Sequence, residues 1–94
     1  MIISFGSKNT HLIWNGEWIK GLPNEIQEIA RRKLRMINNS QNLADINSAP
    51  SNRLKKLKGK LKDYHSIRIN DQWRIIFKFI KGNASEVKIT DYHK

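Results

Sequence analysis

The stretch HSIRINDQWRIIFKF, residues 65–79, carries the clearest structural signal in this chain. Apolar and polar side chains alternate along it, and a period of two is typical of strands with one buried face. Asn70 and Asp71 interrupt the alternation, and both residue types favour turns. The stretch therefore predicts two antiparallel strands, over residues 64–69 and 73–80, joined by a tight turn.

Each strand of this hairpin carries one arginine close to the turn. The apolar face is expected to hold Ile67, Ile69, Trp73, Ile75, Phe77 and Phe79. Arg68 and Arg74 fall between these residues, so the alternation places both on the other, uncovered face of the sheet. An anion can bind on such a face. The alternative is a solvated face, on which surface arginines discourage edge pairing.

The rest of the chain predicts helices followed by a run of strands. Apolar residues recur at helical spacing from Ile26 to Ile37, so we expect an amphipathic helix over residues 23–38. The other expected elements are a strand over 1–5, a helix over 8–14, a helical turn over 43–46, a loop over 48–52, a strand from Leu54 to Leu57, a turn at Gly82-Asn83 and a strand over 84–91. This order predicts a single α+β domain, residues 1–94, in which an N-terminal strand and two or three helices pack on one face of an antiparallel sheet.

The charge balance indicates a polyanionic partner. The chain has eighteen Lys and Arg residues and eight Asp and Glu residues, which gives a net charge of +10. Nucleic acid is the first candidate, an acidic protein the second and an anionic membrane surface the third, while solubility alone is the bland alternative. The chain has no cysteine, no signal-peptide pattern and no apolar run of membrane-spanning length, so we expect a soluble cytoplasmic protein.

A basic run in the middle of the chain predicts contacts with phosphate groups. Residues 53–62 hold six cations and no acid. They are Arg53, Lys55, Lys56, Lys58, Lys60 and Lys62. With Arg31 and Arg35 on the predicted helix, they form a candidate RNA-binding surface. Taken alone, the run is equally typical of a solvated lysine-rich segment.

The titratable residues favour chemistry without a metal or another cofactor. The acids are scattered, and His11, His65 and His93 lack the spacing of zinc ligands. Metal-free RNA cleavage needs a group that accepts the proton of the ribose 2′-hydroxyl, cations for the charged phosphorane and an acid for the leaving 5′-oxygen. His93 is a candidate acid or base, although a histidine at a chain end is more often idle.

Three segments together resemble the HigB branch of the RelE-like toxins. They are LKG at 57–59, SIRINDQWRI at 66–75 and DYH at 91–93. The resemblance covers essentially the whole chain. It implies a compact microbial-RNase-like α+β fold and ribosome-dependent cleavage of messenger RNA in the A site. It also implies a helix-turn-helix antitoxin of the HigA kind, which neutralises the toxin and through which the complex contacts operator DNA.

The resemblance also assigns roles to single residues. Arg74 is expected to stabilise the scissile phosphate and Lys58 to contact phosphate, while His93 acts as acid or base and Tyr92 orients or stacks on a base. Asp91 is expected to hold His93 or a basic neighbour, or to cap the strand end.

The chain departs from the family pattern at two of these positions. Lys55 stands where some members carry a catalytic histidine, and a lysine of ordinary pKa is a poor base at neutral pH. Asn70 stands where some members carry a second arginine, and Arg68, two residues earlier on the same side, is expected to substitute.

Other functions remain compatible with the same residues. The same basic surface suits a non-catalytic protein that binds RNA or the ribosome. An interaction protein that binds only an acidic antitoxin is a second alternative. A DNA-binding module ranks lower, because no helix-turn-helix pattern stands out and the cations lie on sheet and loop as much as on helix.

Overall fold

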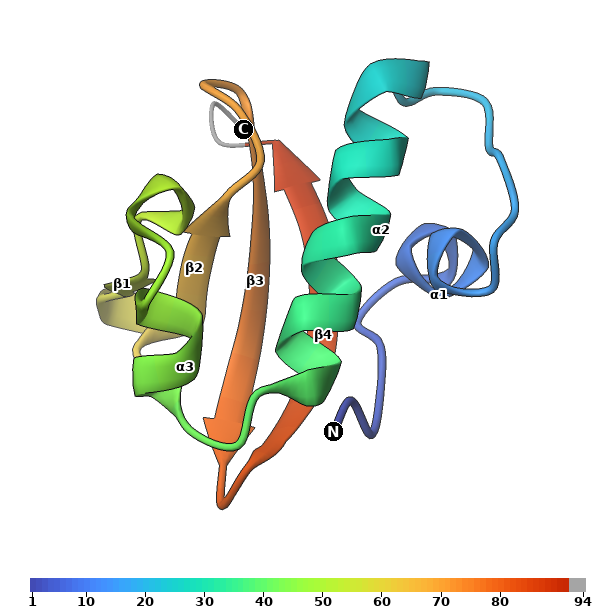
Figure 1. The fold of residues 1–94 in the computed structure, drawn as a ribbon. Helices are drawn as coiled ribbons and strands as arrows, with labels where there is room; N and C mark the ends of the chain where they lie inside the picture. The colour runs from blue at the N-terminus through green and yellow to red at the C-terminus, as the bar shows by residue number, and fades with distance from the viewer. Residues whose placement is uncertain (92–94) are drawn as a thin grey trace.

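A computed structural model describes residues 1–91, which form three helices and a four-stranded antiparallel sheet (Figure 1). The helices are α1 (Lys8–Trp14), α2 (Asn24–Asn39) and α3 (Leu43–Asn47), and the strands are β1 (Lys55–Lys56), β2 (His65–Arg68), β3 (Trp73–Ile80) and β4 (Asn83–Asp91). The strands neighbour one another in chain order. The helices lie on one face of the sheet, and this confirms the predicted α+β architecture.

The core lies between α2 and the sheet. Ile26, Ala30, Leu34 and Ile37 recur at helical spacing on α2 and are buried against the strands. From the sheet, alternate residues of β2 and β3 reach the same core, and Ile67, Ile75 and Phe77 are fully buried. Burying one such side chain stabilises a fold by about 1.5–3 kcal/mol. The predicted alternation of the hairpin is therefore confirmed.

No helix among residues 1–91 has the length and apolar character needed to cross a bilayer.

The hairpin between β3 and β4 turns one residue earlier than expected. Ile80 pairs with Asn83, so the loop is Lys81-Gly82 and Asn83 already belongs to β4. Both loop residues have positive φ, 50° at Lys81 and 81° at Gly82. Two-residue hairpins favour this geometry because its twist matches that of the strands.

The loop that was predicted over 48–52 contains a short 3₁₀ helix, Pro50–Asn52.

The N-terminal segment lies along β4 without forming a continuous strand. Its predicted strand reduces to two isolated parallel bridges, Ile2 to Ala84 and Phe5 to Val87. Between them β4 is irregular, because Glu86 has a φ of 50° and the register with β3 shifts there. The Glu86 N–H donates to the Ser4 hydroxyl, so a side chain replaces the missing ladder bond.

Two side chains of α2 hold the loop between α1 and α2. The Gln27 amide is fully buried: its oxygen accepts from the Ile19 N–H, and its nitrogen donates to the Ile19 and Leu22 carbonyls. Arg31 donates to the carbonyls of Ile13 and Glu17, at 2.8 Å each. The loop is therefore pinned to the helix by side chains in place of regular backbone pairing.

We predict that Gln27→Leu lowers the free energy of unfolding by about 2–4 kcal/mol, because it leaves backbone groups of the loop without their partners. Urea denaturation measures the change. Glu28→Leu is the matched control, since Glu28 is the exposed neighbour on the same helix. Equal stabilities of the two variants would contradict the role assigned to the buried amide.

Candidate nucleic-acid interface

The two arginines of the first hairpin lie directly opposite each other. Arg68 on β2 and Arg74 on β3 are cross-strand Cα partners, so their side chains leave the sheet on the same face. Like charges in such a pair destabilise a sheet. Local acceptors offset the repulsion here: Arg68 Nη2 lies 2.5 Å from the Asp71 carboxylate, and Arg74 Nη1 donates to the Asn70 carbonyl.

The turn between the arginines is held by several hydrogen bonds. The Asn70 side-chain oxygen accepts from the N–H groups of Gln72 and Trp73, at 2.9 and 2.8 Å. The Trp73 carbonyl accepts from the N–H groups of Ile69 and Asn70. An Asn side chain that bonds the backbone ahead of it is a recurrent turn device. The predicted Asn70-Asp71 turn is confirmed, and it positions both guanidinium groups.

A pocket of about 340 Å³ opens on the sheet face that the helices leave uncovered. Its lining combines cations, hydroxyls, one carboxylate and aliphatic side chains: Arg53, Lys55, Leu57, Leu61, Ser66, Arg74, Ile76, Thr90 and Asp91. Strand register brings four of these together, because Ser66 pairs with Ile76 and Arg74 pairs with Thr90. The pocket can therefore surround an anion with guanidinium, ammonium and hydroxyl donors beside an apolar wall.

The basic run divides between this pocket and a second hollow. Arg53 follows the 3₁₀ helix in a left-handed conformation, with a φ of 47°, and lines the pocket with Lys55. The second hollow, of about 600 Å³, is lined by Lys56, Leu57, Lys58, Gly59, Lys62 and Asp63. Leu57 lines both, so the two hollows meet at this residue, although Lys55 pairs with Ser66 and Lys56 with His65, on opposite faces of β1. Lys60 lies exposed on the short helix Gly59–Leu61.

The structure brings together only some of the predicted site residues. Arg74, Arg53 and Lys55 meet in the pocket, while Arg68 lies beside it with its guanidinium turned to Asp71. Three further lysines line the adjoining hollow, namely Lys56, Lys58 and Lys62. Arg31 and Arg35 lie on α2, in the layer on the other side of the sheet. Tyr92 and His93 lie outside the described residues.

Several pocket residues were not predicted as site residues. Alternation along β2 and β3 places Ser66 and Ile76 on the face of Arg68 and Arg74, so this signal was available in the sequence. Leu57 and Leu61 come from an irregular segment whose side-chain directions no period describes. Asp91, which was expected to hold His93 or a basic neighbour or to cap the strand end, lines the pocket and accepts a hydrogen bond of 3.0 Å from the Gln72 side chain.

The local environment shifts the pKa values of Asp71 and His65. The hydrogen bond that Arg68 donates, together with the positive charge of Arg68, lowers the pKa of Asp71 below the usual range. Because the folded-state pKa is depressed, the ion pair is present above the ordinary carboxyl pKa and is lost as the pH falls through the lowered value. Burial, together with the charge of Lys56, lowers the pKa of His65. Both effects favour the neutral form of that imidazole.

His65 cannot serve the pocket from its position. It pairs with the buried Phe77, and the two ring centroids are 6.0 Å apart, so its side chain lies on the helix-covered face. Among residues 1–91 no three His, Asp or Glu side chains gather into a possible metal site.

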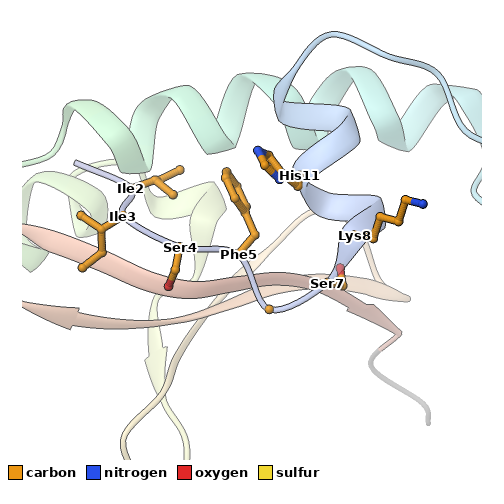
Figure 2. A pocket seen from close by; sticks show the side chains of 8 residues that line it. Ile2, Ile3, Ser4, Phe5, Ser7, Lys8 and His11 are labelled. Atoms are coloured by element: carbon orange, nitrogen blue, oxygen red, sulfur yellow. The ribbon is translucent and has the colours of Figure 1, made fainter.

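A third hollow lies at the opposite edge of the sheet, along the N-terminal segment (Figure 2). Its lining runs from Ile2 to Lys8 and includes His11. The Phe5 and His11 rings stack at 4.7 Å with an interplanar angle of 13°. This hollow holds none of the predicted site residues, so the candidate interface is the pair of hollows around β1.

The fold and the pocket define a small, basic α+β protein whose open sheet face carries a hollow lined by Arg53, Lys55 and Arg74. A family model described as the RelE-like toxin HigB of type II toxin-antitoxin systems matches residues 6–93. The chain belongs to this HigB-like toxin family, which confirms the resemblance drawn from residues 57–59, 66–75 and 91–93.

Individual relatives support the family and the fold. The chain is 37% identical to the toxin HigB-1 of Vibrio cholerae over 73 residues, which are 78% of this chain and 76% of the relative. It is 31% identical to the endoribonuclease HigB of Proteus vulgaris over 93 residues, which are 99% of this chain and 100% of the relative. The solution structure of a conserved hypothetical protein of Helicobacter pylori has the same fold, with a TM-score of 0.59 at 14% identity and coverage of 100% and 98% of the two chains.

We predict that Asp71→Asn tightens binding of single-stranded RNA about two- to five-fold, because it releases Arg68 from a surface ion pair. Fluorescence anisotropy with a short labelled oligonucleotide measures the affinity. Glu28→Gln makes the same change in net charge on the opposite layer and serves as the control. If both variants bind equally tightly, net charge alone explains the gain and Arg68 is not held back by Asp71.

Proposed function

We propose that this protein is the toxin of a type II toxin-antitoxin system and acts as a metal-independent, ribosome-dependent endoribonuclease. Its substrate is messenger RNA in the ribosomal A site, and its cleavage inhibits translation in the cytoplasm. The observation that carries the proposal is the convergence of Arg74, Arg53 and Lys55 in one pocket on the open sheet face. Three cations around a cavity of this size suit a phosphate group that gains negative charge during reaction.

The relatives support catalysis as well as binding. The Proteus vulgaris relative is named an endoribonuclease, and the similarity spans its full length and nearly all of this chain. Family membership supports a cognate antitoxin as a partner. We propose a helix-turn-helix antitoxin of the HigA kind, encoded with the toxin, as the protein that neutralises it and that contacts operator DNA for the complex.

The proposed reaction is a transesterification within the RNA. The ribose 2′-oxygen attacks the adjacent phosphorus as its proton leaves, the bond to the 5′-oxygen breaks, and that oxygen receives a proton. Arg74 donates to the phosphorane oxygens, and Arg53 and Lys55 neutralise the added charge. His93 is assigned the proton transfer and Tyr92 the orientation of a base, on the strength of the family resemblance. Asp91, which directly precedes them in the chain, lines the pocket.

The adjoining hollow extends the binding site for the RNA strand. Lys56, Lys58 and Lys62 line it, and Leu57 connects it to the pocket. Phosphates on either side of the scissile group would follow this path over the β1 edge. The ribosome presents the substrate in this proposal.

A non-catalytic RNA-binding or ribosome-binding protein is the second candidate. The observation that favours it is Lys55, which lines the pocket where some family members carry a catalytic histidine. The basic surface would bind equally well without turnover. Substitution of Arg74 separates the candidates, because a binder loses affinity whereas a nuclease mainly loses rate.

We predict that Arg74→Ala lowers the cleavage rate about 10²- to 10³-fold, because a preorganised donor to the charged phosphorane is lost. Primer extension on messages from induced cells, together with growth curves, measures the effect beside wild type and His93→Ala. Arg74→Lys is the matched variant, since it keeps the charge but loses the planar fork of donors.

Binding of the cognate antitoxin shows that the Arg74 variants are folded. Wild type that leaves messages whole and growth unaffected would overturn the nuclease proposal. Cleavage that survives in Arg74→Ala would remove this residue from its assigned role.

We predict that cleavage continues in the presence of EDTA, because arginine and lysine side chains provide the cationic stabilisation in this mechanism. The assay uses purified ribosomes kept intact with polyamines, programmed with a defined message. Ribosome integrity is checked by sedimentation in the same buffer. Loss of cleavage with intact ribosomes would show that a metal ion takes part.

A further inference from the structure

Lys33 extends from α2 to the end of β2, where the arginine hairpin turns. Its ammonium donates to the Arg68 carbonyl at 2.5 Å and to the Asn52 side-chain oxygen at 2.9 Å. These two acceptors lie far apart in the sequence and on different elements. Lys33 therefore joins the helix layer to two segments at the edge of the pocket.

Asn52 is a fixed point in this arrangement. It is only 2% exposed, and its amide nitrogen donates to the Ile46 carbonyl at 3.0 Å and to the Met36 sulfur at 3.1 Å. Its oxygen accepts from Lys33. The Asn52 side chain thus uses both its donor and its acceptor atoms, and its orientation is determined from three sides.

The two segments that Lys33 joins carry the guanidinium groups of the interface. Asn52 directly precedes Arg53, which lines the pocket. Arg68 is the cross-strand partner of Arg74, which lines the same pocket. A shift of either segment would move one guanidinium group relative to the other, and a displacement of about 1 Å can cost a catalytic site about 10²-fold.

We propose that Lys33 is a positioning residue for the phosphate-binding pocket: it holds the Arg53 segment and the Arg68–Arg74 strand pair at a fixed separation through its two hydrogen bonds. The role in cleavage rests on the proposed nuclease function, whereas the role in binding RNA rests on the basic surface that both candidate functions share.

The electrostatics of Lys33 favour this role over a general contribution of charge. Burial lowers its pKa, and the charges of Arg68, Arg32 and Arg74 lower it further. The positive charge of Lys33 is therefore repelled by these neighbouring arginines, and a neutral side chain would remove this repulsion. What Lys33 contributes is the reach of a long side chain that ends in several N–H donors.

The test compares Lys33→Met with Arg32→Met. Both remove one positive charge from adjacent residues of α2, but Arg32 is exposed and only Lys33 donates to Asn52 and Arg68. The probe for binding is a single-stranded RNA with 2′-O-methyl riboses, which cannot be cleaved by attack of the 2′-oxygen. Affinity at fixed salt, cleavage on programmed ribosomes and urea stability are measured for each variant.

We expect Lys33→Met to weaken RNA binding and cleavage at least ten-fold more than Arg32→Met, at protein concentrations and temperatures where both are folded. Lys33→Arg, which keeps a long side chain with N–H donors, should restore most of the loss. If the Lys33→Met variant does not fold, Lys33→Gln is measured in its place. The shorter amide of glutamine can keep one of the two hydrogen bonds, so we expect an intermediate loss of RNA binding and cleavage.

Equal affinities and rates for the Lys33 and Arg32 variants would overturn the proposal, as would losses that follow only the unfolded fraction. Wild type that binds the probe but cuts no message would refute the nuclease function, while the affinities would still decide the role of Lys33.

Discussion

The structure depends on the antiparallel register that sets Arg68 opposite Arg74. The same register buries Ile67 and Ile75, which are also cross-strand partners, on the helix-covered face. A slip by one residue would exchange the two faces and bury the arginines, so the hydrophobic core specifies the position of the charged pair. Core and interface are two consequences of one alternating pattern.

Two guanidinium groups at this spacing repel each other, and the surrounding structure compensates with nearby acceptors. Arg68 contacts the exposed Asp71 carboxylate, and Arg74 donates to a turn carbonyl. A phosphate, like a carboxylate, offers oxygens that match the planar fork of a guanidinium group. Both arginines therefore keep protein acceptors while their side chains stay at the surface of the sheet.

Much of the fold was predictable because its signals are local. The alternation from His65 to Phe79 gives β2, β3 and their faces, and the spacing from Ile26 to Ile37 gives α2. The failures came where distant residues determine the local structure. The bridges at Ile2 and Phe5 depend on an irregularity in β4, and the turn at Lys81-Gly82 depends on the pairing of Ile80 with Asn83.

The site was predictable only in part, for a related reason. Arg74, Arg53 and Lys55 were found because charge and strand period mark them in the sequence. Leu57 and Leu61 line the pocket from an irregular segment, and only the tertiary fold brings them there. Lys33 was not predicted as a site residue, yet it lies three residues after the buried Ala30 and four before the buried Ile37. A cation beside the apolar stripe of a helix is a signal for an inward contact.

The positions of the histidines narrow the proton chemistry of the proposed reaction. Among the described lining residues of the pocket, none has an ordinary pKa near neutrality, since they are Arg, Lys, Asp, hydroxyl and aliphatic side chains. His65 is directed to the helix-covered face, and His11 stacks on Phe5 at the far edge of the sheet. Their positions therefore exclude His65 and His11 from proton transfer in the pocket. The proposed reaction assigns the proton transfer to His93, which follows the pocket-lining Asp91 by two residues in the sequence. The replacement of a family histidine by Lys55 then leaves the pocket with more positive charge and fewer proton acceptors, which favours binding of the phosphate over the speed of its cleavage.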